Sequence, residues 1–186
     1  MKLFQTVNYL LKKYDGRLNY TKLIKILYLA DRKSLKETGR SITEDNYCCM
    51  KLGPVLENLY SLITGNCSDS SFQLQWSNLF VKDGFDLVGI SDKLPDGELS
   101  RYEKRIIDEI DKTYHDVPYQ KMVEIVHDKS VCPEWEMPSS GKAELSKEKI
   151  LSCVGFSNEQ IEQILEEDQV YENDKKIFDN LQKECM

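Results

Sequence analysis

Apolar positions dominate one predicted helix, which covers residues 20–36. At about 100° per residue they span roughly 200° of its circumference, wider than the stripe of an ordinary surface helix. We therefore expect this helix to lie at the centre of the domain. Asp31 falls inside the apolar arc, and Leu29 falls on the opposite, basic side. The apolar arc contains Leu23, Ile24, Ile26, Leu27, Tyr28, Ala30 and Leu35, and the basic side contains Lys22, Lys25, Arg32 and Lys36.

Asp31 and Leu29 each allow two interpretations. A buried carboxylate needs hydrogen bonds or a cation to offset its desolvation, so Asp31 either caps a neighbouring helix or pairs with an arginine. Alternatively, it is a group of shifted pKa in a functional cleft. Leu29 is either a scattered surface leucine or the apolar centre of a partner-binding face with a basic rim.

Helical periodicity and capping signals predict further helices along the chain. A first helix packs through Phe4, Val7, Leu10 and Leu11 and ends near Asp15-Gly16. A later helix opens at Gly53-Pro54-Val55, where proline suits the first helical position, and ends at Gly65. Serines that can cap helices precede three more segments, and a proline starts another; these residues are Ser100 with Glu103, Ser146, Ser157 with Gln160, and Pro118.

The hydrophobic period changes from 3.6 to 2 in the middle of the chain. Phe72, Leu74 and Trp76 alternate with polar residues, which predicts a strand. Asp83-Gly84 separates the apolar runs 79–81 and 85–90, which predicts a hairpin. We expect a small antiparallel sheet over residues 72–90, a short extended piece after the loop at 42–51, and a long loop over 128–142.

These patterns predict a mainly α protein of two parts. Residues 1–155 should form a compact helical domain with the small antiparallel sheet, and residues 156–186 an acidic helical extension. The segment from Ser157 carries nine acidic residues against three lysines, and its apolar positions suit two amphipathic helices. Those helices would pack either on the domain or on a partner.

Charge is divided unevenly along the chain, whose net charge is −7. Residues 1–40 carry ten Lys and Arg against three Asp and Glu, a balance of +7, while the other 146 residues carry 15 against 29, a balance of −14. The molecule therefore has either two electrostatic faces or two ends that neutralise each other. The basic segment lacks interleaved aromatic residues and an arginine-rich reading helix, so we do not expect it to bind nucleic acid.

Sites for chemistry are scarce. The six cysteines show no C-x-x-C spacing, which favours reduced thiols and a cytoplasmic protein, and neither a membrane span nor a signal peptide is evident. Motifs for nucleotide binding, zinc proteases or serine hydrolases are missing. Glu124 and His127 lie one turn apart, but two ligands without a third do not make a metal site. We expect no catalytic residues, no metal and no cofactor; an enzyme that uses Asp31 or His127 is the alternative.

Several spaced motifs across residues 5–140 resemble the Panacea domain family, the SocA-like antitoxins. They are Lys22-Leu-Ile-Lys-Ile-Leu-Tyr-Leu-Ala-Asp-Arg32, Gly39-Arg-Ser-Ile-Thr43, Tyr47, Lys51-Leu-Gly-Pro-Val55, Leu59-Tyr60, Leu99-Ser100 with Glu103, His127 and Trp135. The connection from His127 to Trp135 is longer than is usual in the family.

The resemblance implies a helical antitoxin that neutralises a toxin encoded beside it. Family members serve unrelated toxins, including small alarmone-synthetase-like enzymes that modify tRNA, and some resemble adaptors that deliver the toxin to a protease. We expect direct binding that occludes the toxin's active site, because acidic residues can replace the phosphates of a nucleotide or RNA substrate. The alternatives are proteolytic delivery and, from another class, an enzyme or nucleic-acid-binding regulator. A higher-order toxin–antitoxin assembly is compatible with either binding mode.

A partner-binding groove is predicted around the central helix and the Gly-Pro turn. Tyrosines have the amphipathic bulk of binding hot spots, Gly53 allows close backbone approach, and Pro54 would fix the start of its helix. In the opposing interpretation, Asp31 and Arg32 only cap and brace neighbouring helices. If the tyrosines are core residues, the interface lies instead around Leu29 or in the acidic helices after Ser157. The candidate residues are Tyr28, Asp31, Arg32, Lys51, Gly53, Pro54 and Tyr60.

Overall fold

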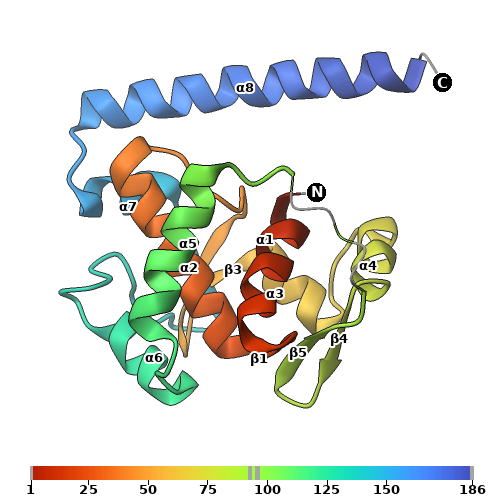
Figure 1. The fold of residues 1–186 in the computed structure, drawn as a ribbon. Coiled ribbons are helices and arrows are strands. Elements are labelled where there is room, and N and C mark those ends of the chain that lie inside the picture. The colour runs from red at the N-terminus through yellow and green to blue at the C-terminus, as the bar shows by residue number, and fades with distance from the viewer. Residues whose placement is uncertain (1, 92–93, 95–96, 185–186) are drawn as a thin grey trace.

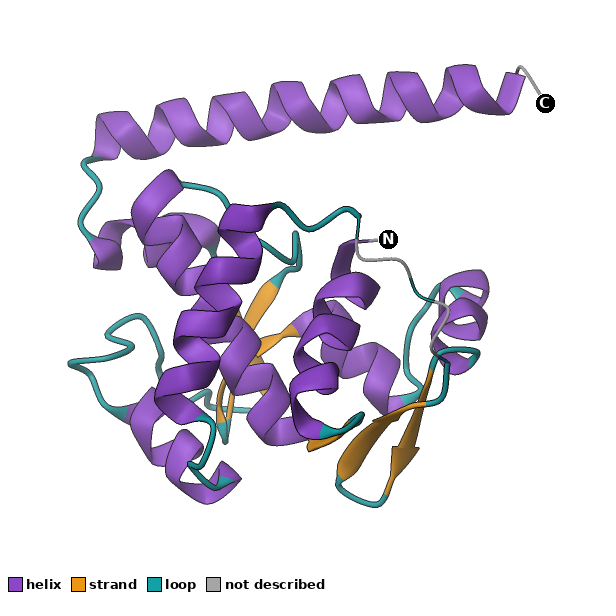
Figure 2. Cartoon of the chain, in the orientation of Figure 1, coloured by secondary structure: helices purple, strands orange, loops and turns teal. Residues whose placement is uncertain are grey.

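The computed structural model describes residues 2–91, 94 and 97–184 and confirms a mainly α protein, 57% helical, with two small antiparallel sheets (Figures 1 and 2). Beyond residue 171, side chains are described only for Asn173, Asp174 and Ile177. Within these residues the helices are α1 (Lys2–Leu11), α2 (Tyr20–Thr38), α3 (Glu57–Thr64), α4 (Ser70–Ser77), α5 (Arg101–Tyr114), α6 (Tyr119–His127), α7 (Lys147–Val154) and α8 (Asn158–Glu184), with a 3₁₀ turn at Lys12–Tyr14. None of the helices in these ranges is both long and apolar enough to cross a membrane.

Helix α2 lies at the centre of the domain, as predicted. Asn19 starts it by accepting hydrogen bonds from the Thr21 and Lys22 amides, and Gly39 ends it in the left-handed conformation. Helices α5, α6 and α7 all pack against α2, and Figure 1 shows α2 crossing behind α5. Because neighbours surround it, its wide apolar arc is fully buried.

The basic side of α2 is largely buried, so both surface interpretations of Leu29 are wrong. Leu29 is only 6% exposed, and both Lys22 and Lys25 are buried. The lysine stems pack inside the domain while their amines reach backbone carbonyls: Lys22 Nζ donates to the His115 oxygen at 2.5 Å and Lys25 Nζ to that of Pro54 at 2.7 Å. Leu29 therefore cannot be the centre of an exposed partner-binding face.

Each of the two sheets has three strands, and together they flank the helical core. One sheet has the order β1-β5-β4, from β1 (Arg17–Asn19), β5 (Asp86–Gly89) and β4 (Phe80–Asp83); the other has the order β3-β2-β6, from β3 (Gly53–Leu56), β2 (Tyr47–Met50) and β6 (Lys142–Leu145). The β4–β5 hairpin confirms the Asp83-Gly84 turn, in which Gly84 has φ +61°. Strands β1 and β6 were not predicted, because each is short and gains its partners only from distant segments.

The strand predicted at Phe72–Trp76 is wrong, because this segment is helix α4. Asp69 caps it by accepting hydrogen bonds from the Ser71 and Phe72 amides. Phe72 and Trp76 lie one turn apart and both contact Phe4, with ring centroids at 4.7 and 5.4 Å. Phe72 and Trp76 fit an alternating strand pattern, but they are also an i, i+4 pair on one face of a helix. The Asp69 cap favours the helix.

The helix start predicted at Gly53-Pro54 is also wrong. Both residues belong to β3, where Pro54 is opposite Cys49 and Gly53 opposite Met50. Proline is tolerated there because β3 is an edge strand. Helix α3 begins only at Glu57, and its first amides are satisfied from outside by Asp45, which accepts from Asn58 and Leu59 at 2.9 Å each.

The C-terminal segment forms one helix instead of the two predicted. Its predicted capping box is confirmed, since the Ser157 amide donates to Gln160 Oε1 at 2.9 Å and the Gln160 amide to Ser157 Oγ at 3.3 Å. No glycine or proline follows Ser157, so nothing in the sequence interrupts the helix. Figure 1 shows α8 as a long straight helix lying along one side of the domain.

Candidate partner-binding site

Asp31 is a fully satisfied carboxylate inside the core. It has no exposed surface and accepts hydrogen bonds from the amides of Ile42 at 2.8 Å and Thr43 at 3.0 Å, and from the hydroxyls of Thr43 and Tyr47. Burial raises the pKa of Asp31, and these hydrogen bonds oppose that shift. Asp31 therefore braces the loop after α2, rather than capping a helix or pairing with an arginine.

Arg32 and Tyr28 converge on Glu134, which has no exposed surface. Tyr28 donates to Glu134 at 2.6 Å, and the Arg32 guanidinium makes two bonds with it, at 2.7 and 3.2 Å. Sequence reasoning missed Glu134, although it immediately precedes Trp135 of the family motif. This charge is buried but paired on both carboxylate oxygens, as burial requires.

Gly53 and Pro54 pack against α2 and α6. Gly53 has φ +106°, and a Cβ atom there would lie 2.5 Å from Val126 Cγ2, so the close approach that glycine allows here is to α6. The Pro54 carbonyl accepts the hydrogen bond of Lys25. Burial lowers the pKa of Lys25 to about 7, because this carbonyl is a neutral partner for a nearly enclosed amine.

The structure thus brings most of the candidate residues together, but inside the domain. Four of them are buried, namely Tyr28, Asp31, Gly53 and Pro54, and Arg32 is mostly covered. In this conformation they cannot contact a partner directly and influence binding only by positioning the segments around them. Lys51 is exposed in the turn between β2 and β3, and Tyr60 on α3 is half-buried. Direct contact by Lys51 and Tyr60 stays a prediction.

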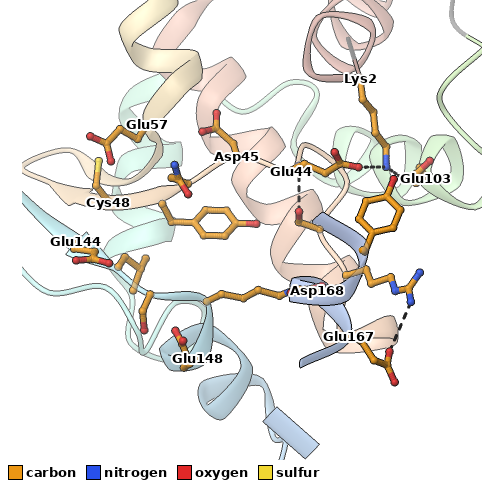
Figure 3. Close-up of a pocket in the computed structure, with 18 of the residues that line it drawn as sticks. Lys2, Glu44, Asp45, Cys48, Glu57, Glu103, Glu144, Glu148, Glu167 and Asp168 are labelled. Atoms are coloured by element: carbon orange, nitrogen blue, oxygen red, sulfur yellow. Dashed lines mark hydrogen bonds and ion pairs between the residues drawn. The ribbon is translucent and has the colours of Figure 1, made fainter. Parts of the chain in front are cut away.

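The loop that Asp31 braces forms one wall of a cleft of about 860 Å³ (Figure 3). The start of α3, strand β6, the start of α7 and the middle of α8 form the other walls. Figure 3 shows carboxylates from these separate segments around the same cleft. That of Asp45 is occupied by the amides at the start of α3. Eight acidic residues line the cleft against four basic ones: Glu44, Asp45, Glu57, Glu103, Glu144, Glu148, Glu167 and Asp168 against Lys2, Arg40, Lys142 and Lys147.

Ion pairs neutralise only part of this acidic lining. Among the described residues, Asp45, Glu144 and Glu148 have no ion-pair partner, so acidic side chains remain in excess. The cleft therefore favours cationic groups. The pairs are Lys2 with Glu103 at 2.6 Å and Glu44 at 3.4 Å, Arg40 with Glu167 at 3.7 Å, Lys147 with Asp168 at 2.5 Å, and Lys142 with Glu57.

Helix α8 is anchored over this cleft by its first three turns. Ile161, Ile164 and Leu165 pack on the core. Ile164 covers Gly39 at the end of α2, where an added Cβ would lie 2.8 Å from Ile164 Cδ1. From Gln169 onward, every residue whose side chain is described is exposed. The second half of α8 thus lies outside the core.

His127 stacks on Trp135, with ring centroids 3.9 Å apart and an angle of 7° between the rings. The longer connection between these two family positions is accommodated in the loop without separating them. His127 Nε2 has no hydrogen-bond partner among the described residues. Across the same residues, no three His, Cys, Asp or Glu side chains are grouped to hold a metal ion.

Comparison with known proteins places this domain in a family. A family model described as "Antitoxin SocA-like, Panacea domain" matches residues 23–136. No curated protein and no solved structure matches the chain. The matched region contains most of α2, the buried partners of Asp31 and Arg32, and the His127–Trp135 stack, and it covers more than half of the chain. The chain therefore belongs to the SocA-like antitoxin family, defined by the Panacea domain.

Proposed function

We propose that this protein is an antitoxin that neutralises a cognate toxin by binding it directly and covering its active site. The observation that carries this proposal is the family match over residues 23–136. The described cysteines are free thiols, which suits action in the reducing cytoplasm, where a toxin from the neighbouring gene would also be made. The complex would be a simple pair or a higher-order toxin–antitoxin assembly.

The charge distribution supports occlusion as the mode of neutralisation. A toxin that uses a nucleotide or RNA substrate needs a basic site for the phosphates, and an acidic protein surface can occupy such a site. Here the acidic residues of the cleft and of α8 lie close together, since Glu167 and Asp168 belong to both. A small alarmone-synthetase-like toxin that modifies tRNA would present the required basic surface.

We assign the protein no catalytic role of its own. The carboxylate of Asp31 is enclosed and engaged in four hydrogen bonds, so it is not available to a substrate. His127 is stacked on Trp135, and burial lowers its pKa. Both residues serve the packing of the domain.

An activity assay with purified proteins tests this proposal. The product of the neighbouring gene is assayed with increasing amounts of antitoxin and no protease. Inhibition that saturates near stoichiometric ratio, together with copurification and rescue of growth, is the expected result. A toxin that keeps full activity in the complex but disappears faster in cells would favour proteolytic delivery. Rescue of growth without a detectable complex would overturn direct neutralisation.

A further inference from the structure

Helix α8 extends well beyond the turns that pack on the domain. The helix has 27 residues, so it is about 40 Å long at 1.5 Å per residue. Ile161, Ile164, Leu165 and Asp168 face the domain at i, i+3, i+4 and i+7, and after Asp168 every side chain of α8 that is described is exposed. In Figure 1 the C-terminal end of α8 lies far from its connection to α7.

Acidic residues on the two sides of α8 differ in their partners. On the side towards the domain, Asp168 pairs with Lys147 and Glu167 with Arg40. On the outer side, Glu159, Glu162 and Glu166 are exposed and make no ion pair among the described residues. The outer charge is therefore left for a molecule other than this chain.

Two large apolar side chains share that outer side. Val170 is 60% exposed and Ile177 58%, although both are aliphatic. At about 100° per residue, these two and the three outer glutamates lie within roughly 80° of one another, opposite Ile161. Two exposed aliphatic residues seven positions apart, beside acidic ones, suit a helix that binds in an apolar groove with a basic rim.

We propose that this outer face of α8, comprising Glu159, Glu162, Glu166, Val170 and Ile177, is the main docking element for the toxin. This inference rests on the proposed function and names the partner's chemistry: an apolar groove for Val170 and Ile177, rimmed by lysines and arginines. The helix is formed before binding, so docking does not require ordering of the backbone.

Charge decides between this partner and a second copy of the chain. The segment from Ser157 holds nine acidic residues against three lysines, so two α8 helices side by side would bring like charges together. A basic toxin surface removes this repulsion and gains attraction from the same residues. The occupant is therefore a basic protein surface.

A double substitution in the full-length chain tests the apolar contact. Val170→Lys combined with Ile177→Lys should weaken binding to the neighbouring gene's product by about 100-fold. The two aliphatic side chains would be buried in the complex, and the lysines that replace them would be repelled by the basic surface of the toxin. Leu74→Lys is the matched control, since Leu74 is also a helical residue and is 65% exposed. The control should bind like the wild type, and all three proteins should melt alike.

The charged rim is tested separately through association kinetics. Glu159→Lys, Glu162→Lys and Glu166→Lys together should slow association about tenfold at low salt, with little difference at about 0.5 M salt. A folding defect would not produce this salt dependence. Unchanged association at low salt would overturn the rim's role.

The wild-type measurement separates the two levels of the proposal. If the wild type binds and inhibits the toxin but the lysine variants bind equally well, the docking face is wrong while the antitoxin function stands. If the wild type neither binds nor inhibits the toxin, both the docking face and the antitoxin function are refuted. Self-association of the wild type that the double variant abolishes would instead make this face a contact between copies.

Discussion

The α2 core and the outer face of α8 use polar residues in opposite ways. Around α2, Asp31 and Glu134 are buried and their oxygens are occupied by groups of the same chain. On α8, the outer glutamates are exposed and have no ion-pair partner within the described chain. Polar residues of a family motif can therefore serve the fold. A surface that binds a partner is recognised instead by exposed charged and apolar side chains that have no partner in the same chain.

This division also separates stability from binding. A buried ion pair is costly to break, because the remaining charge has no water to replace its partner. Exposed helical residues can be changed at little cost to folding. The buried core should thus determine whether the protein folds, and the outer face of α8, which lies outside the matched region, should determine how tightly the toxin is held.

The largest expected effect comes from breaking the Glu134 network. Glu134→Gln should lower the free energy of unfolding by about 3–5 kcal/mol, because Arg32 loses its buried counter-charge. Denaturant unfolding measures the loss. Glu136→Gln is the matched control, since this exposed neighbour pairs with Lys149 on the surface and should cost at most about 1 kcal/mol. Equal losses in the two variants would contradict the assignment of Glu134 to the core.

Removal of an apolar side chain from α2 should have an effect of similar size. Leu27 has no exposed surface, so Leu27→Ala should cost about 2–5 kcal/mol through cavity formation. Leu74→Ala, at an exposed helical position, should change stability by less than about 0.5 kcal/mol. A nearly neutral Leu27→Ala would show that α2 is peripheral.

Stability should depend on pH through Lys25. Its pKa is lowered to about 7 in the folded state, so the unfolded chain binds more protons between pH 7 and about 10.5 and stability rises with pH in that window. Relative to Lys25→Met, the wild type should gain roughly 3 kcal/mol from pH 7 to 10. Burial raises the pKa of Cys48 to about 11 and that of Cys132 to about 12, so these thiols lower stability as the pH rises above about 9. Both thiols are present in the wild type and in Lys25→Met, so their effect cancels in the comparison. Parallel pH profiles for the two proteins would contradict a proton-linked Lys25.

The two candidate tyrosines should behave differently. Tyr28 is enclosed and bonded to Glu134, so Tyr28→Ala should lower stability and neutralisation together. Tyr60 is half-buried on α3, one turn after Glu57 of the cleft. Tyr60→Ala should weaken toxin binding about tenfold, or 1.4 kcal/mol, with a melting temperature near that of the wild type. A binding loss that merely follows a stability loss would make Tyr60 a core residue as well.

Much of the fold was predictable because its signals are local. The α2 arc, the Asp83-Gly84 hairpin and the Ser100 and Ser157 capping boxes each depend on residues a few positions apart. Pro54 misled the prediction because proline suits both a first helical position and an edge strand, and only pairing with Cys49 decides between them. The spacing of Phe72 and Trp76 fits both a strand and a helix, and only their contact with Phe4 decides for the helix.

The candidate site was less predictable because its geometry is not local. The cleft draws carboxylates from the loop after α2, from β6 and from α8. Nothing in the sequence shows that Asp31 supports one of its walls, although its burial was predicted. The acidic character of the C-terminal segment was predicted from composition. The structure was needed to show that it forms one helix, and that its described acidic residues are ion-paired on the inner side but not at Glu159, Glu162 and Glu166.

Hydrogen exchange of the free antitoxin and of its complex with the neighbouring gene's product tests the central claim most directly. We expect new protection in the peptides that cover α8 from Gln169 onward, because the described side chains of this half are exposed in the free chain. Peptides of α2, which is already buried, should change little. Protection confined to the β4–β5 hairpin or to α2, with α8 exchanging as fast as in the free protein, would contradict it.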